Sequence, residues 1–231
     1  MTQWADGTFM NRLSLPAQSA LSSRGGWTEY PAGITLLRQG DWDTDVLLLE
    51  NARSSPRACV KVVVTSEAGD ESLLGLRTSG DVIGELASIC GAPRTATVTT
   101  CTATAVRKFT RGSFDQFLAE WPEAQRELMV MLASRLNWAN RCRHEFTQYP
   151  VLVRLARMIA DVADRFGHAT GQGRAVGIQL SQREWGQLIG ASEETVRQAM
   201  RRLRDHALIE NSYRRIVITD VELLRQYEDP A

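Results

Sequence analysis

One segment of the chain brings together residue types that can bind an anion, and it reads GELASICGAPRTA. Arg94 supplies a guanidinium that can contact a phosphate through two N–H groups, and Thr95 adds a hydroxyl. Gly84 lets the backbone approach a ligand closely, and Glu85 can accept a hydrogen bond from a sugar hydroxyl. A short helix over 86–90 would point backbone N–H groups at the anion. A ribose phosphate would use all of these groups, although a simple salt bridge between Glu85 and Arg94 is the alternative.

A second segment, residues 178–204, predicts two short helices joined by a tight turn. Its sequence is IQLSQREWGQLIGASEETVRQAMRRLR. Ser181 and Glu184 have the spacing of a capping box, in which each side chain bonds an N–H group left free at the helix start. Gly190 ends the first helix, and Ser192 can cap the second. This pattern is typical of a helix-turn-helix, which binds DNA with its second helix.

The second of these helices has two different faces. Apolar residues occupy the face expected to pack inward: Val196, Ala199, Met200 and Leu203. The opposite face offers arginine for guanine or phosphate, glutamine for adenine and glutamate for cytosine. A hairpin with a basic tip follows and reads as a wing. The candidate DNA contacts are Ser181, Gln182, Ser192, Glu193, Glu194, Thr195, Arg197, Gln198, Arg201 and Arg214. The alternative is a solvated pair of amphipathic helices.

The elements that must position these segments change character along the chain. Short β-rich runs separated by turn residues occupy about 27–110 and predict a sandwich, jelly roll or barrel. The runs are 35–37, 46–49, 60–64, 73–76 and 96–99. Beyond them Ser113 is the expected cap of a helix, a long helix follows from about 123 to 147, and another covers 151–166. A glycine-rich loop is expected over 167–177. We therefore predict three parts: 1–122, 123–149 and 150–231.

The long helix is expected to form a homodimer. Its apolar residues keep helical spacing, and Leu128, Leu132 and Leu136 are the expected seam. The alternative is that the helix packs on its own β-domain, and both arrangements can hold along different parts of its length.

Composition limits the other classes of function. The 27 basic and 27 acidic residues give a formal net charge of zero, so DNA binding must come from a local patch. The four cysteines are far apart, which argues against a disulfide framework or a zinc site. We expect no metal, no signal peptide and no membrane span, and therefore a cytoplasmic protein. The sequence contains no nucleophile–base pair, metal cluster or Walker-type loop, so we expect no enzyme.

The glycine–glutamate–leucine and arginine–threonine–alanine motifs resemble the phosphate-binding cassette of the cyclic AMP receptor protein and fumarate–nitrate reductase regulator (CRP/FNR) family. The helix-turn-helix resembles that of the same family, and the likeness spans roughly 8–220. It implies an α+β fold: an N-terminal cyclic-nucleotide-binding β-roll (jelly roll), a long dimerisation helix and a C-terminal winged helix-turn-helix. It also implies a ligand-responsive transcription regulator that binds a pseudo-palindromic operator in double-stranded DNA as a homodimer, with RNA polymerase as a further partner.

The resemblance implies roles for individual residues. The ribose would be held by Gly84 and Glu85 and the cyclic phosphate by Arg94 and Thr95, within the cassette that Leu86 and Ala96 complete. Arg135 on the long helix matches an arginine near the phosphate and the cassette glutamate. Ala139 and Asn140 stand where one branch of the family reads the base with a threonine–serine pair, so Asn140 is the remaining candidate for contact with the base. Cyclic AMP or a related cyclic nucleotide is the implied effector.

The sequence also departs from the family. Glu193 and Gln198 replace two arginines of the usual recognition helix, so a different operator is expected. An iron–sulfur sensor is disfavoured because the first cysteine is Cys59, and a haem sensor because the three histidines lie outside the β-roll. Two alternatives stay open: a family member that binds DNA without a cyclic nucleotide or with another small-molecule effector, and a cyclic-nucleotide-binding regulatory subunit without DNA binding.

Overall fold

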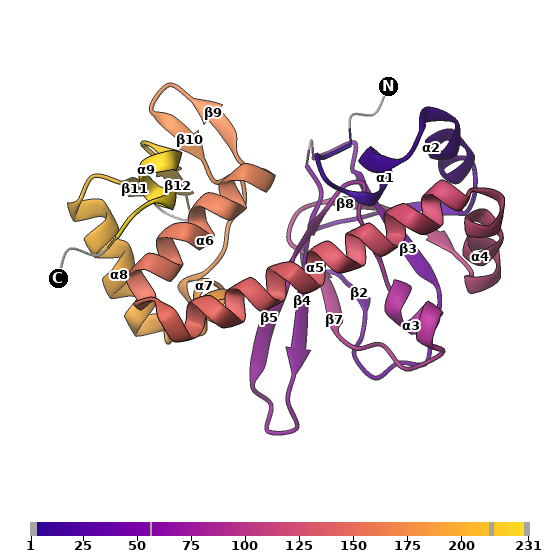
Figure 1. Cartoon of the computed structure of the whole chain (residues 1–231), viewed down its shortest axis with the longest axis horizontal. Coiled ribbons are helices and arrows are strands. Elements are labelled where there is room, and N and C mark those ends of the chain that lie inside the picture. The colour runs from indigo at the N-terminus through magenta and orange to yellow at the C-terminus, as the bar shows by residue number, and fades with distance from the viewer. Residues whose placement is uncertain (1–3, 56, 213–214, 229–231) are drawn as a thin grey trace. The chain divides into compact units, whose positions relative to one another are not determined.

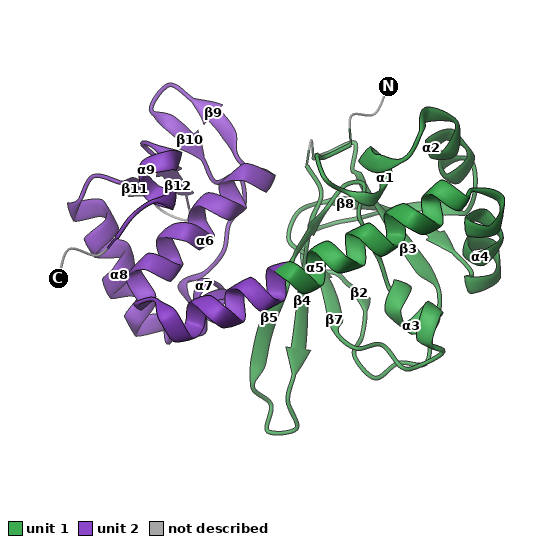
Figure 2. Ribbon diagram, viewed as in Figure 1, with its two compact units in different colours: residues 1–137 green, residues 138–231 purple. Residues whose placement is uncertain are grey.

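The computed structural model describes residues 4–55, 57–212 and 215–228. The chain forms two compact units, residues 1–137 and 138–231, shown in two colours in Figure 2. One long helix, α5 (Pro122–Gln148), runs from the first unit into the second. The long helix predicted from the sequence is therefore present as a single element.

The first unit is built on two four-stranded antiparallel sheets, which confirms the predicted β-roll (Figure 1). The first sheet has the order β1-β8-β3-β6, formed by Gly26–Tyr30, Thr104–Phe109, Val46–Asn51 and Val82–Ile83. The second has the order β2-β7-β4-β5, formed by Thr35–Leu37, Thr97–Thr100, Cys59–Thr65 and Glu71–Thr78. The sequence analysis did not anticipate β8, although it pairs with both β1 and β3.

Strand β3 explains how one sheet serves two cores. Successive side chains of a strand point to opposite faces. Leu47 and Leu49 belong to an apolar cluster with residues of the second sheet, whereas Val46 and Leu48 belong to a cluster with the helices. The near-continuous apolar run of this strand therefore reflects burial on both faces.

The apolar cluster that contains Val46 and Leu48 is completed by helices. They include α1 (Phe9–Arg12), α2 (Leu15–Ser22) and α4 (Arg111–Glu120). The cap of α4 differs from the prediction. Thr110, not Ser113, is the N-cap, and its hydroxyl accepts a hydrogen bond from the Ser113 N–H. The helix consequently begins two residues earlier than Ser113. A threonine three residues ahead of a serine offers two possible caps, and the sequence alone did not distinguish them.

The predicted dimer seam on α5 needs correction. Leu128 is 4% exposed and belongs to the core of its own β-roll, and Leu132 packs against that core. Leu136 is 61% exposed and Met129 is 59% exposed. The apolar pattern of α5 therefore combines two faces. Two of the three leucines predicted for the seam, Leu128 and Leu132, lie on the face that is buried within the chain.

The second unit combines helices with a small antiparallel sheet. Its helices are α6 (Val151–Phe166), α7 (Gln182–Ile189), α8 (Glu193–Asp205) and α9 (Val221–Arg225). Its sheet has the order β11-β12-β10-β9, formed by Ile209–Ser212, Arg215–Ile218, Gly173–Ala175 and His168–Thr170. The predicted glycine-rich loop over 167–177 thus contains the β9–β10 hairpin. None of the helices in the described part of the chain is long and apolar enough to cross a membrane.

Candidate functional site

Arg94 is the most enclosed charged residue of the predicted cassette. Its side chain is 2% exposed. Its Nη1 donates a hydrogen bond to the Gly84 carbonyl at 2.9 Å, and its Nη2 donates to the Asp45 carbonyl at 2.7 Å and to Asp43 Oδ2 at 2.9 Å. Its Nε is buried without a hydrogen-bond partner among the described residues. Arg94 is therefore held by protein groups and forms its salt bridge with Asp43, not with Glu85.

Gly84 makes this arrangement possible. It has a φ of 81° and is the N-cap of α3 (Glu85–Cys90), which is the short helix predicted here. A Cβ at this position would lie 2.5 Å from Arg94 Nη1 and 2.8 Å from the Asp45 carbonyl oxygen. The glycine is thus required both by its left-handed backbone and by the close approach of the guanidinium.

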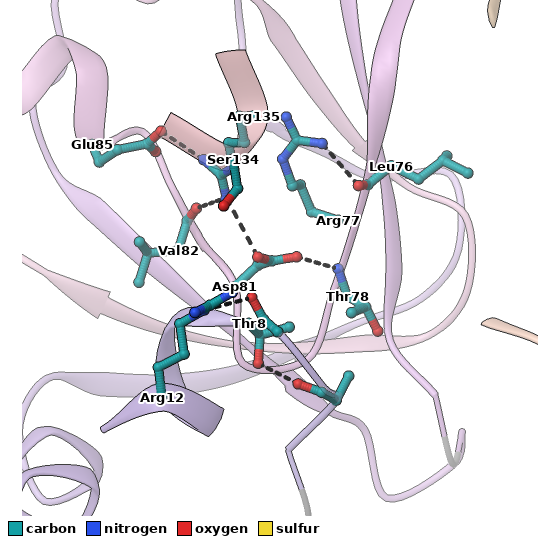
Figure 3. A network of polar contacts seen from close by, with 12 residues as sticks. Thr8, Arg12, Leu76, Arg77, Thr78, Asp81, Val82, Glu85, Ser134 and Arg135 are labelled. Carbon is teal, nitrogen blue, oxygen red and sulfur yellow. Dashed lines mark hydrogen bonds and ion pairs between the residues drawn. The ribbon is translucent and has the colours of Figure 1, made fainter. Parts of the chain in front are cut away.

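Glu85 takes part in a separate buried network that joins the cassette to α5 (Figure 3). Arg135 Nη1 donates to Glu85 Oε1 at 2.7 Å, and Arg135 Nη2 donates to the Val82 carbonyl at 2.9 Å. Arg135 Nη2 also lies 3.5 Å from Asp81, whose other carboxylate oxygen accepts the Thr78 N–H. One arginine therefore forms ion pairs with two carboxylates that are almost fully buried.

The remaining predicted ligand residues differ in their burial and in the unit to which they belong. Leu86 is 42% exposed, Thr95 is exposed, and Ala96 is buried. Asn140 is exposed and belongs to the second unit, whereas the cassette belongs to the first. The structure therefore brings together Gly84 with Arg94, and Glu85 with Arg135.

A cavity of about 160 Å³ opens beside Arg94. Its lining consists of Thr35, Leu36, Leu37, Arg38, Asp41, Asp43 and Arg94. Pockets for drug-sized ligands are typically about 300–1,000 Å³, so this space matches a part of a nucleotide, such as its phosphate. The sequence analysis did not identify Asp43 as a site residue, and the acidic run GDWDTD was the available signal.

The groups around Asp43 favour its ionised form. Burial acts to raise the pKa of this carboxyl group, but hydrogen bonds from the Asp45 N–H and from Arg94 hold the pKa below its ordinary value. The charges of Arg94 and Lys108 act in the same direction. Asp43 is consequently an anion at neutral pH.

The helix-turn-helix of the second unit has the predicted caps. The Ser181 hydroxyl accepts the Glu184 N–H while Glu184 accepts the Ser181 N–H, which is the complete capping box. Gly190 ends α7 with a φ of 64°. The Ser192 hydroxyl accepts the Thr195 N–H at the start of α8. These local bonds fix the turn between the two helices.

The outward face of α8 is as predicted, with the inward residues Val196, Ala199, Met200 and Leu203 buried. Arg197 forms an ion pair with Glu194 at 2.8 Å and donates from Nε to Gln182 at 3.4 Å. Gln198 also donates to Glu194, at 3.2 Å. Arg201 is exposed and has no ion pair or hydrogen bond of its side chain within the described chain. The Arg201 guanidinium therefore keeps its donors free of the other described side chains.

Several other candidate contacts can be placed. Ser181, Ser192 and Glu193 are exposed at the starts of the two helices. Arg214, the predicted wing contact, lies outside the described residues. Arg174 is in strand β10, and its guanidinium donates to the carbonyls of Ala163 and Asp164 near the end of α6. This residue therefore stabilises a helix end.

Arg154, which was not among the residues predicted from the sequence, stabilises the turn between α7 and α8. Arg154 of α6 is 9% exposed and donates from Nη1 to the Ile189 carbonyl at 2.6 Å, at the end of α7. Its guanidinium also stacks on Phe146 of α5, 5.3 Å from the ring centre. An arginine among the apolar residues VLVRLA, at the start of the helix predicted over 151–166, was the available signal.

Comparisons with known proteins match both the predicted nucleotide-binding segment and the predicted DNA-binding segment. Residues 27–120 match the cyclic nucleotide-binding domain family, and residues 153–227 match the Crp-like helix-turn-helix domain family. A CRP-like cAMP-activated global transcriptional regulator of Mycobacterium tuberculosis is 28% identical over 208 residues, or 90% of each chain. The cAMP-activated global transcriptional regulator CRP of Escherichia coli O157:H7 is 28% identical over 194 residues, covering 82% of this chain and 88% of the relative.

Solved structures share the fold. The global regulator CLP of Xanthomonas campestris, described as c-di-GMP responsive, has a TM-score of 0.74 at 19% identity, covering 90% of this chain and all of that one. The two domain matches occur in the family's order, and the relatives are DNA-binding regulators, not enzymes. This chain belongs to the CRP/FNR family of DNA-binding transcription regulators.

Proposed function

We propose that this regulator binds its operator as a homodimer and that a cyclic nucleotide, with cyclic AMP as the first candidate, controls the binding. The observation that carries the proposal is the cassette arginine, Arg94, placed at the edge of a cavity inside the cyclic-nucleotide-binding domain. Relatives described as cAMP-activated support this effector. RNA polymerase is the proposed further partner, and a regulator with these partners would work in the cytoplasm.

Calorimetry with cyclic AMP and with cyclic GMP, up to millimolar concentration, tests the effector. Glu85→Gln should weaken binding because the proposed ribose contact loses its charge. The matched control is Glu50→Gln, since Glu50 forms a comparable ion pair with Arg107 at 2.7 Å elsewhere in the same unit. If both variants bind like the wild type, the role given to Glu85 is refuted.

A second candidate function is regulation without a cyclic nucleotide. It is favoured by the three protein acceptors that already bond the Arg94 guanidinium. An absence of binding heat with both cyclic nucleotides, together with specific DNA binding, would select this candidate.

Ala139 lacks the hydroxyl that the resemblance implies for base recognition, so Asn140→Ala is the variant that tests base preference.

For DNA binding we propose that α8 enters the major groove and that Arg201 reads a base. Losing such a contact typically costs about 1–3 kcal/mol of discrimination. Arg201→Ala should therefore bind an operator selected from a random library roughly 5- to 150-fold more weakly. The control Arg111→Ala removes one exposed arginine from α4 in the first unit and should bind like the wild type. Equal affinity of all three proteins would show that the assigned face is wrong.

For the dimer we propose the exposed face of α5 as the interface, with Met129 and Leu136 as its apolar members. Leu136→Glu should produce a 25.7-kDa monomer where the wild type is twice that mass. The matched control is Leu15→Glu, because Leu15 on α2 is equally exposed, at 61%. A wild-type monomer, or a Leu136→Glu dimer, would contradict this interface.

A further inference from the structure

The Asp43 carboxylate occupies the part of Arg94 that an anionic effector would need. Asp43 Oδ2 accepts the Arg94 Nη2 hydrogen bond at 2.9 Å, and both residues line the same cavity. The Arg94 side chain is 2% exposed whereas that of Asp43 is 45% exposed. The aspartate therefore covers the solvent side of the guanidinium.

The other nitrogens of Arg94 are less accessible to a ligand, because Nε, which has no hydrogen-bond partner among the described residues, is buried. Nη1 is bonded to the Gly84 carbonyl, and the second bond of Nη2 is to the Asp45 carbonyl. Both carbonyls belong to the backbone, so they cannot move away without changing the loop or the cassette. The Asp43 side chain can move away by rotation alone. A phosphate oxygen can thus reach Nη2 by replacing this carboxylate.

Charge acts in the same direction. The cavity lining contains two aspartates, Asp41 and Asp43, and two arginines, Arg38 and Arg94. Two like charges in contact repel each other, and water screens this repulsion only in part at the half-exposed Asp43. A phosphodiester placed on Arg94 beside an ionised Asp43 is therefore disfavoured until the carboxylate leaves.

We propose that Asp43 is a specificity-determining residue of the effector site, whose carboxylate competes with the effector's phosphate for Arg94. This inference rests on the proposed function and adds a cost specific to anionic effectors. The wild-type protein consequently binds a cyclic nucleotide more weakly than the same cassette would without Asp43. An effector binds by exchanging one anion for another on the same guanidinium.

The test compares Asp43→Asn with Asp41→Asn. Asparagine has the same shape, and its side-chain oxygen can still accept the Asp45 N–H that Asp43 Oδ1 accepts at 2.9 Å. Asp41→Asn removes the same charge from the same cavity but leaves the Arg94 salt bridge intact. Calorimetry should give at least about fivefold tighter binding of cyclic AMP or cyclic GMP to Asp43→Asn, and a smaller change for Asp41→Asn.

A second measurement does not depend on the nucleotide. Thermal unfolding is followed in sodium phosphate and in sodium chloride at equal ionic strength. Phosphate should raise the melting temperature of Asp43→Asn more than that of Asp41→Asn or the wild type. If phosphate has this effect while no protein binds either nucleotide, the competition stands and the proposed effector is wrong. If Asp43→Asn gains no phosphate stabilisation, or binds the nucleotide more weakly than the wild type, Asp43 positions Arg94 and the proposal is overturned.

Discussion

The contact between Glu85 and Arg135 can be tested without any ligand, by a double-mutant cycle. Arg135→Met removes the cation from two nearly buried carboxylates and also the hydrogen bond to the Val82 carbonyl. Removing one partner of a buried pair typically costs about 3–5 kcal/mol. Because the Arg135 side chain is 19% exposed, water screens part of the loss, and we expect about 3 kcal/mol, the lower end of that range.

Glu85→Gln keeps an acceptor for Arg135 but removes its charge. Hydrogen bonds to charged groups contribute about 1.5–3 kcal/mol, and we expect a loss of about 1.5 kcal/mol for this variant. In the double variant Glu85→Gln/Arg135→Met no charge remains at position 85, so its loss should stay near 3 kcal/mol, below the additive value of about 4.5 kcal/mol. The expected coupling is therefore about 1.5 kcal/mol, against the roughly 0.5 kcal/mol seen for independent sites.

The assay is urea unfolding of the full chain followed by tryptophan fluorescence. All four proteins are compared at one concentration, because association of subunits makes the apparent stability depend on concentration. If the double variant loses the sum of the two single losses within about 0.5 kcal/mol, the two residues do not interact in solution. That result would also contradict a direct contact between Glu85 and α5.

Other predictions concern the cassette glycine, the thiols and a helix end. Gly84→Ala should lower the free energy of unfolding by about 1–3 kcal/mol, as measured by urea unfolding. An alanine there would keep a left-handed backbone, and its Cβ would collide with Arg94. Burial raises the pKa of Cys142 to about 11, so at pH 8 its thiolate is scarce, and mass spectrometry should show exposed Cys90 alkylated long before Cys142. Arg174→Ala should lower the melting temperature by a few degrees, with unchanged DNA affinity of the folded protein, because its hydrogen bonds hold the end of α6.

The sequence predicted the helix-turn-helix well because its signals are local. Ser181 and Glu184 are three residues apart, and their reciprocal bonds depend only on that spacing. Gly190 and Ser192 likewise act on their own neighbours. The inward face of α8 follows from its helical period alone. None of these features needs information about distant parts of the chain.

The partners of the cassette could not be predicted in the same way. Arg94 and Asp43 are 51 positions apart, and the fold decides which carboxylate reaches the guanidinium. Closeness in the chain made Glu85 the alternative partner of Arg94, but Glu85 pairs with Arg135, 50 positions away. Only the family resemblance, and no local signal, had placed Arg135 near this glutamate. Because removing Arg94 leaves the Gly84 and Asp45 carbonyls without their hydrogen bonds, Arg94→Ala should destabilise the protein.

The apolar pattern of α5 shows a second limit. Periodicity identifies the apolar residues of a helix but not the surface that each one covers. Leu128 and Leu136 are eight positions apart and read as one stripe, yet one is 4% exposed and the other 61% exposed. Eight positions turn a helix by about 80°, so Leu128 faces the β-roll core while Leu136 points away from it.

The contacts of α5 within each unit suggest how an effector would act. In the first unit Arg135 holds the cassette glutamate, and in the second Phe146 lies under Arg154, which bonds the last carbonyl of α7. Both residues belong to the same helix, α5. We propose that an effector acts on the first of these contacts, by binding one state of the Glu85–Arg135 pair more tightly than another and so shifting the population of that pair.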